Sequence, residues 1–197
     1  QGDVFRIIYI HVPSAWLSLF GYTAMAVAGV VILVWRLKIA EIFIIAAAPI
    51  GASFTFLTLV TGSIWGEPTW GTWWVWDARL TSELILLFLY LGVIALHQAI
   101  ESPRIAARAC ALLSVVGVIN IPIIHYSVVW WNTLHQGSTI RPLGGSTMET
   151  DMIIPLLIGA LGFTLIFGWL TLWRMRAQLI WRERRSRWVT RMIHHER

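Results

Sequence analysis

The sequence predicts an all-α protein, a polytopic integral membrane bundle of helices with a tryptophan-rich external loop. Of its 197 residues, 57% are hydrophobic and only 13% are charged, whereas about a quarter of the residues are charged in ordinary soluble domains. The mean hydropathy is +0.70. The charge deficit excludes an ordinary soluble domain and also a disordered chain.

Five apolar stretches are long enough to cross a membrane, which takes about 20 residues of helix. They run from about Pro13 to Trp35, Ala40 to Gly62, Leu80 to Gln98, Ile105 to His125 and Met152 to Trp173. Each must be helical, because lipid offers the backbone no hydrogen-bond partners. We expect Pro13 in the first turn of its helix, and Pro49 and Pro122 to kink their spans or to lie near their ends.

The distribution of basic residues predicts the orientation. Twelve of the 15 Lys and Arg residues lie between the first two spans, between spans three and four, or after span five. The positive-inside rule therefore puts the C-terminus in the cytoplasm and residues 1–12, 63–79 and 126–151 outside. Since five spans leave Gln1 outside and the chain does not begin with Met, we expect that a preceding span is missing.

The chain divides into a membrane bundle, residues 1–175, and a basic tail, residues 176–197. The tail interleaves arginines with apolar residues, which predicts an amphipathic helix on the anionic inner leaflet. A plain stop-transfer anchor is the simpler alternative. Nucleic-acid binding is disfavoured because the lipid surface is adjacent. The single cysteine, Cys110, excludes an internal disulfide and a CxxC redox pair.

Five tryptophans within twelve residues form the strongest local signal. They are Trp65, Trp70, Trp73, Trp74 and Trp76. An aromatic belt at the membrane interface is one interpretation. The density exceeds what a belt needs, and Gly66, Pro68 and Gly71 predict a shaped loop rather than a helix end. The alternative is a rigid apolar platform for a large planar ligand.

Two histidines, His11 and His135, lie on the predicted external side. Each is, in the simplest interpretation, a hydrogen-bonded polar residue. Neutral imidazole is also the usual axial ligand of haem iron, so two imidazoles beside an indole surface predict a porphyrin site. A structural zinc site is disfavoured, because zinc takes four ligands. His125 is a weaker third candidate, and the predicted topology excludes His97, His194 and His195.

Charged residues follow the tryptophans. Arg79 and Glu83 are four residues apart. Either the two side chains pair with each other, or Arg79 pairs with a carboxylate of the ligand. Asp77 is expected to cap the third span through its first free N–H groups.

The stretch from Trp70 to Thr81 matches the WGxxWxWDxRxT signature of haem-handling proteins of cytochrome c biogenesis. Ile8–Pro13, Ile124–Ser127 and Trp130–Ser138, with Trp130 and Trp131, match the flanks. The chain closely resembles the haem exporter protein C (CcmC) family of the bacterial system I pathway, and the resemblance covers nearly the whole chain to about Gln136. Family members have six spans, so the resemblance implies that the five spans expected here correspond to the second to sixth.

The resemblance implies a non-enzymatic haem-transfer subunit of the bacterial inner membrane. Its haem b would be held non-covalently at the periplasmic face by His11 and His135, which flank the tryptophan-rich segment, and passed to the haem chaperone CcmE. The implied partners are an ABC ATPase subunit, a membrane partner and a small single-span protein (CcmA, CcmB and CcmD). No Walker motif occurs in this chain, so ATPase activity belongs to a partner.

Three rival functions remain at this stage. A permease would line its spans with polar residues, and these spans are nearly free of charge. A haem–apocytochrome c ligase would need more spans and a larger external region. A b-type cytochrome for electron transfer would place histidine pairs inside the spans, whereas here the candidates flank them.

Overall fold

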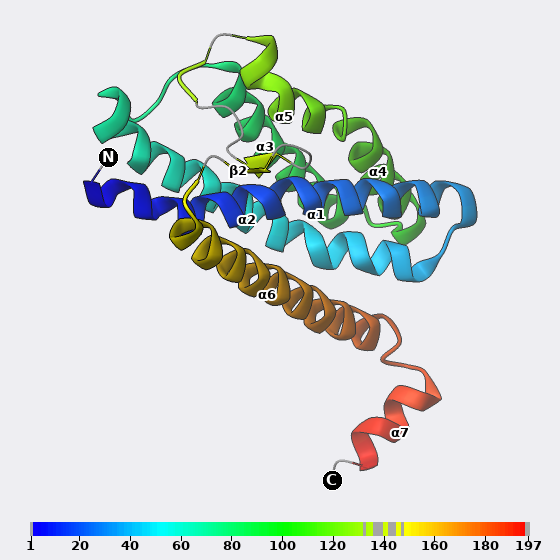
Figure 1. Cartoon of the computed structure of the whole chain (residues 1–197). Coiled ribbons are helices and arrows are strands. Elements are labelled where there is room, and N and C mark those ends of the chain that lie inside the picture. The colour runs from blue at the N-terminus through cyan, green and yellow to red at the C-terminus, as the bar shows by residue number, and fades with distance from the viewer. Residues whose placement is uncertain (1, 132, 136–139, 142–144, 147, 196–197) are drawn as a thin grey trace.

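The computed structural model confirms a bundle of membrane-length helices (Figure 1). It describes residues 2–131, 133–135, 140–141, 145–146 and 148–195. Among these residues, five helical segments are long and apolar enough to span a membrane. Parts of the expected external loop 126–151 and the end of the tail lie outside the described residues.

The first two helices form an antiparallel pair. A 3-10 turn, η1 (Gly2–Ile7), leads into α1 (Ile8–Trp35), and α2 (Lys38–Trp70) follows directly. The turn between them is tight because Arg36 adopts the left-handed conformation, with φ 55°, and donates its N–H to the Ile32 carbonyl. Since α1 begins at Ile8, the expectation that Pro13 occupies its first turn is wrong, and the first span begins at residue 8 rather than at about Pro13.

The second helix extends further than expected. It runs through Pro68 to Trp70 and ends at Gly71, whose φ of 74° lets its N–H reach the Glu67 carbonyl. The expectation that Gly66 and Pro68 shape a loop is therefore wrong. The helix continues although Pro68 has no N–H for the Ile64 carbonyl, and only residues 71–77 connect α2 to α3.

The remaining spans are α3 (Ala78–Ala99), a broken fourth segment and a long last helix. The fourth segment consists of α4 (Pro103–Gly117) and α5 (Asn120–Trp130). The break lies four residues before Pro122, which has no N–H for the Val118 carbonyl. That carbonyl accepts instead from the N–H of Ile121, so the expected effect of Pro122 is confirmed.

Two short strands, β1 (Ile140–Arg141) and β2 (Gly145–Ser146), pair antiparallel with Ile140 opposite Ser146. They precede α6 (Thr150–Arg182) and α7 (Arg187–His195). The expected boundary at residue 176 falls inside α6. In Figure 1, α6 extends away from the bundle and α7 lies at its far end.

Two tyrosines fill the centre of the bundle. Tyr22 of α1 and Tyr90 of α3 are fully buried, with ring centroids 5.0 Å apart. Their hydroxyls donate to the carbonyls of Leu113 and Ser18. Tyr90 packs directly against Gly51, where a Cβ would collide with its ring. These contacts lock α1, α2 and α3 together and fix where their ends meet.

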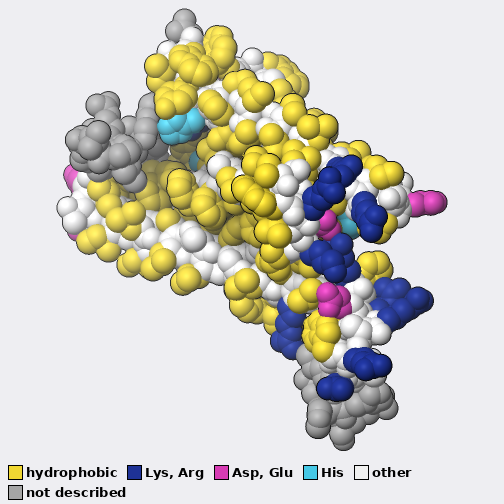
Figure 2. Space-filling view, turned by 90° about the vertical axis from the view of Figure 1, so that its right-hand side faces the viewer, with side chains coloured by type: hydrophobic (Ala, Val, Ile, Leu, Met, Phe, Trp, Pro, Cys, Tyr) yellow, Lys and Arg dark blue, Asp and Glu magenta, His cyan; other side chains and the backbone are white. Residues whose placement is uncertain are grey.

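The last helix is held more loosely. A small cluster of Leu17, Ile50 and Phe167 packs α6 against α1 and α2. At its C-terminal half, Arg182 pairs with Glu41 at 2.7 Å and the Nε of Arg174 donates to the Ala46 carbonyl. Figure 2 shows Lys and Arg side chains gathered on one side of the molecule, with hydrophobic side chains covering much of the rest.

Candidate functional site

The candidate site lies where α1, α2 and α3 meet the segment 71–77 and residue His135. We call this part the histidine end, and the opposite part around Glu41, Arg174 and Arg182 the arginine end. At the histidine end, segment 71–77 is shaped locally by Thr72, whose hydroxyl donates to the Trp74 carbonyl at 3.1 Å. It then delivers Asp77 to the start of α3.

Asp77 connects two elements. Its Oδ1 accepts the backbone N–H of Leu80 at 2.8 Å, which confirms the expected N-cap. Its Oδ2 lies 2.9 Å from the Nδ1 of His135. Both side chains are nearly enclosed, with 6% of Asp77 and 14% of His135 exposed. One carboxylate therefore holds the helix start and the imidazole in a fixed relation.

The hydrogen bond to Asp77 determines the tautomer of His135. A carboxylate only accepts, so Nδ1 must carry the hydrogen, and Nε2 keeps its lone pair. Burial lowers the pKa of His135 below 6.5, and this outweighs the hydrogen bond and charge of Asp77, which raise it. The imidazole is therefore neutral near pH 7, the form that binds metals.

His11 is arranged in the same way by a hydroxyl. It lies in the second turn of α1, and its Nδ1 is 2.9 Å from the Oγ1 of Thr61 on α2. The Thr61 oxygen also lies 2.7 Å from the Leu57 carbonyl and 3.2 Å from the Thr58 carbonyl. With its one proton directed to either carbonyl, the hydroxyl accepts from the His11 N–H, and Nε2 keeps its lone pair.

Arg79 provides the positive charge of the site. It is close enough to interact electrostatically with His11, His135 and Asp77. Its guanidinium makes no hydrogen bond or ion pair with the described residues. The expected pair with Glu83 is not formed, because the Glu83 carboxyl contacts Ser18 of α1 instead. The Arg79 guanidinium is thus available to an anionic group.

The tryptophans occupy two kinds of position. Trp65 and Trp70 meet edge to face at 5.1 Å, and Trp70 meets the His135 ring at 4.7 Å. The indole nitrogens of Trp65 and Trp74 are buried with no hydrogen-bond partner in the described part of the chain. Leaving such a donor unsatisfied costs about 1–3 kcal/mol, so both donors are open to an acceptor.

The other tryptophans are exposed. Trp73 is 60% and Trp76 75% exposed, and Trp76 contacts Trp74 edge to face. Trp130 and Trp131 are also exposed, at the end of α5, where Trp130 stacks on Tyr126. They make no ring contact with His135. The third candidate, His125, is exposed on α5 and packs on Tyr126.

The donors present at the histidine end fit haem. They comprise two neutral imidazoles with free Nε2 atoms, aromatic rings, an unpaired guanidinium and two indole N–H groups without acceptors. They do not fit a structural zinc ion, because no group of three or more His, Cys, Asp or Glu residues that could hold a metal occurs in the described ranges.

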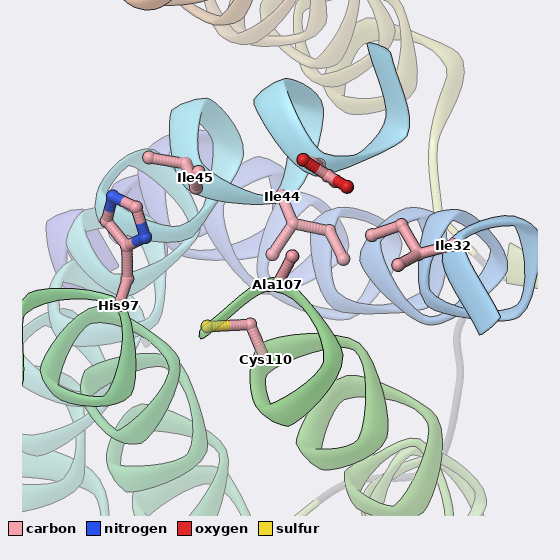
Figure 3. A pocket seen from close by; sticks show the side chains of 7 residues that line it. Ile32, Ile44, Ile45, His97, Ala107 and Cys110 are labelled. Carbon is pink, nitrogen blue, oxygen red and sulfur yellow. The ribbon is translucent and has the colours of Figure 1, made fainter. Parts of the chain in front are cut away.

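A small pocket lies at the opposite end, between α1, α2, α3 and α4 (Figure 3). It is lined by residues that include Glu41, His97 and Cys110, and its cavity volume of about 10 Å³ has room for about one water molecule. This pocket is therefore too small for a porphyrin.

Sequence reasoning missed two roles. Thr61 is 50 residues from His11, and nothing in its local sequence distinguishes it from the other threonines of α2. Asp77 was expected as a cap and as one of the haem-binding residues, but its hydrogen bond to His135, 58 residues away, was not expected. Its place between the tryptophans and Arg79 is the one signal that could have suggested a second role.

Fold and site together define a multi-pass membrane protein with a histidine- and tryptophan-lined face at one end of its bundle. A family model described as "Heme exporter protein C" matches residues 1–190. The chain belongs to this family, and hence to the proteins that handle haem in cytochrome c biogenesis.

Individual proteins of this family are also similar to the chain in sequence. The chain is 55% identical to the heme exporter protein C of Escherichia coli K12 over 193 residues, which is 98% of this chain and 78% of the relative. It is 52% identical to that of Haemophilus influenzae, over 96% and 77% of the two chains. A putative cytochrome c biosynthesis ccmC-like mitochondrial protein of Marchantia polymorpha is 48% identical, over 85% and 71%.

Proposed function

We propose that this protein binds haem b non-covalently at the periplasmic face of the inner membrane and delivers it to the haem chaperone CcmE. The observation that carries the proposal is the pair of imidazoles whose Nδ1 atoms are both engaged, by Asp77 and by Thr61. This arrangement presents two Nε2 lone pairs at the same end of the bundle, as axial ligation of an iron porphyrin requires.

Each further group has a defined role in this proposal. Arg79 pairs with a carboxylate of the porphyrin, and the buried indole N–H groups of Trp65 and Trp74 offer hydrogen bonds. Trp70 packs beside the His135 ligand, while Trp73 and Trp76 form an exposed aromatic surface. Trp130 and Trp131 extend this surface from α5.

The distribution of charge supports the orientation. The arginines of α6 and α7 are separated from the histidine end by the length of the bundle (Figures 1 and 2). The positive-inside rule then places the arginine end in the cytoplasm and the site in the periplasm. The basic tail lies on the anionic leaflet, and CcmA, CcmB and CcmD are the partners that complete an ABC-type complex.

Binding and delivery are tested separately. The purified chain in lipid nanodiscs, supplied with haem, should give the absorption spectrum of iron ligated by two imidazoles. The double variant His11→Ala/His135→Ala should not, whereas His125→Ala should. An unchanged spectrum in the double variant would contradict the ligand assignment.

Delivery is measured by adding purified CcmE to the haem-loaded protein, with the other subunits present, and following haem on the chaperone. Replacing the exposed Trp73 and Trp76 by Ala should slow transfer more than it weakens binding. Equal transfer by the variant would remove the exposed tryptophans from the delivery step.

A further inference from the structure

One ionisable group near the site has no role so far. Glu83 of α3 is 5% exposed and lies one helical turn deeper in the bundle than Arg79. A carboxyl group at such a position is costly inside a membrane protein and typically functional. Its Oε1 is 2.8 Å from the hydroxyl oxygen of Ser18 on α1.

The Ser18 hydroxyl can serve Glu83 in either protonation state. The same oxygen is 2.8 Å from the Ala15 carbonyl, and a hydroxyl has only one proton to donate. When Glu83 is ionised, Ser18 donates to it. When Glu83 is protonated, the acid donates to Ser18, and Ser18 donates to Ala15. Neither state leaves the Glu83 Oε1 without a hydrogen bond.

The balance between the two states depends on few neighbours. On α3, Arg79 is the nearby cation, and it also interacts with Asp77. Tyr90 of α3 and Tyr22 of α1 are neutral phenols, and Tyr90 donates to the Ser18 carbonyl. From α5, Asn120 reaches only the Ser82 carbonyl. In the described part of the chain, Arg79 is therefore the charge that favours ionised Glu83.

We propose that Glu83 is the internal counter-charge of Arg79 and takes up a proton from the aqueous face when a carboxylate of a bound ligand pairs with Arg79. This rests on the proposed function, in which that ligand is haem and the carboxylates are its propionates. The carboxylate of Glu83 gains one proton as the guanidinium gains a new partner. Glu83 is thus a positioning residue that keeps the charge beneath the site constant.

The coupling is measured as proton uptake. Haem binding to the protein in nanodiscs is followed by calorimetry in two buffers of different ionisation enthalpy. The difference in apparent heat, divided by the difference in ionisation enthalpy, gives the number of protons taken up. Wild type should take up as much as one proton more than Glu83→Gln. Its haem affinity should weaken by as much as tenfold per pH unit as the pH rises, and that of the variant should stay nearly flat.

Controls separate this effect from general damage. Glu67→Gln removes an exposed carboxylate at the same end of the bundle and should retain the uptake. Haem dimethyl ester has no free carboxylates and should bind wild type without uptake. If Glu83→Gln fails to accumulate, Arg79→Gln leaves the carboxyl in place and should also abolish the uptake.

Infrared spectroscopy gives a second readout, because a protonated carboxyl band should appear on haem addition in wild type and not in Glu83→Gln. Equal uptake in wild type and Glu83→Gln, or full uptake with the dimethyl ester, would overturn the inference while leaving haem binding intact. Failure of wild type to bind haem at all would instead contradict the proposed function.

Discussion

The two ends of the bundle differ in whether their polar groups have partners within the protein. At the arginine end, polar groups satisfy one another: Arg182 pairs with Glu41 and Arg174 donates to a helix carbonyl. At the histidine end, each imidazole uses one nitrogen and leaves the other, Arg79 is unpaired among the described residues, and two buried indole N–H groups have no acceptor.

This difference distinguishes anchoring from binding. Satisfied pairs at the arginine end hold α6 against α2 and need nothing further. Polar groups left unsatisfied in a buried place cost stability, and that cost is offset when a ligand supplies the missing partners. Both ends carry charge and aromatic rings, so composition alone does not distinguish them. The polar atoms without a hydrogen-bond partner do distinguish them.

The largest effect is expected from the ligands themselves. His11→Ala or His135→Ala should weaken haem binding by more than about 100-fold, since loss of a group that merely supports a metal ligand already costs roughly 10–100-fold. Haem titration followed by absorption measures this. His97→Ala at the arginine end is the matched control, and an equal loss there would erase the distinction between the ends.

Asp77→Asn should have the next largest effect. Asn keeps one oxygen, which can still cap α3, but it puts an NH2 donor where Oδ2 accepts from His135, and the negative charge that raises the basicity of the ligand is gone. Haem affinity should fall roughly 10–100-fold, with little change in thermal stability. Asp77→Ala should in addition lose about 1 kcal/mol of stability through the missing cap. Unchanged affinity in Asp77→Asn would mean that neither the charge nor the hydrogen bond of Asp77 to His135 matters for haem binding.

Thr61→Val should weaken haem binding by about 10-fold, at the lower bound for a supporting group. Valine keeps the shape but removes the acceptor that fixes the His11 ring. Thr61→Ser retains the hydroxyl and should bind normally. A normal affinity in Thr61→Val would show that His11 is oriented by packing alone.

The pH response of His135 gives a smaller effect. Because burial lowers its pKa in the folded protein, the unfolded state binds more protons at mildly acidic pH. The contribution of neutral His135 to stability is therefore fully present above pH 6.5 and is lost as pH falls towards the lowered value. Asp77→Asn removes a charge that raises this pKa, so the titration should move further down. Nitrogen NMR of labelled histidine follows it, and an upward movement would contradict the arrangement.

The smallest effect is expected at the arginine end. Arg182→Gln removes an ion pair whose partners are 34% and 14% exposed, and such pairs contribute at most about 1 kcal/mol. Thermal stability should fall slightly and haem affinity should not change. A large loss of haem affinity would show that the position of α6 affects the histidine end.

The sequence by itself determined the class of fold, because long apolar stretches with few charges have no stable state but membrane helices. It also determined the cap at Asp77, since a helix start is decided within a few residues. Helix ends were less well determined. α2 runs through Pro68, whereas the fourth segment breaks before Pro122, where the Val118 carbonyl accepts from the N–H of Ile121 instead.

Only the tertiary structure decided the partners of the histidines and of Glu83. Thr61 meets His11, Asp77 meets His135 and Ser18 meets Glu83 because α1, α2 and α3 pack around Tyr22 and Tyr90. These contacts join residues 50 or more positions apart. Spacing along one helix suggested an Arg79–Glu83 pair, but packing against α1 gave Glu83 a different neighbour, since side-chain direction in a bundle follows the surface that each helix buries.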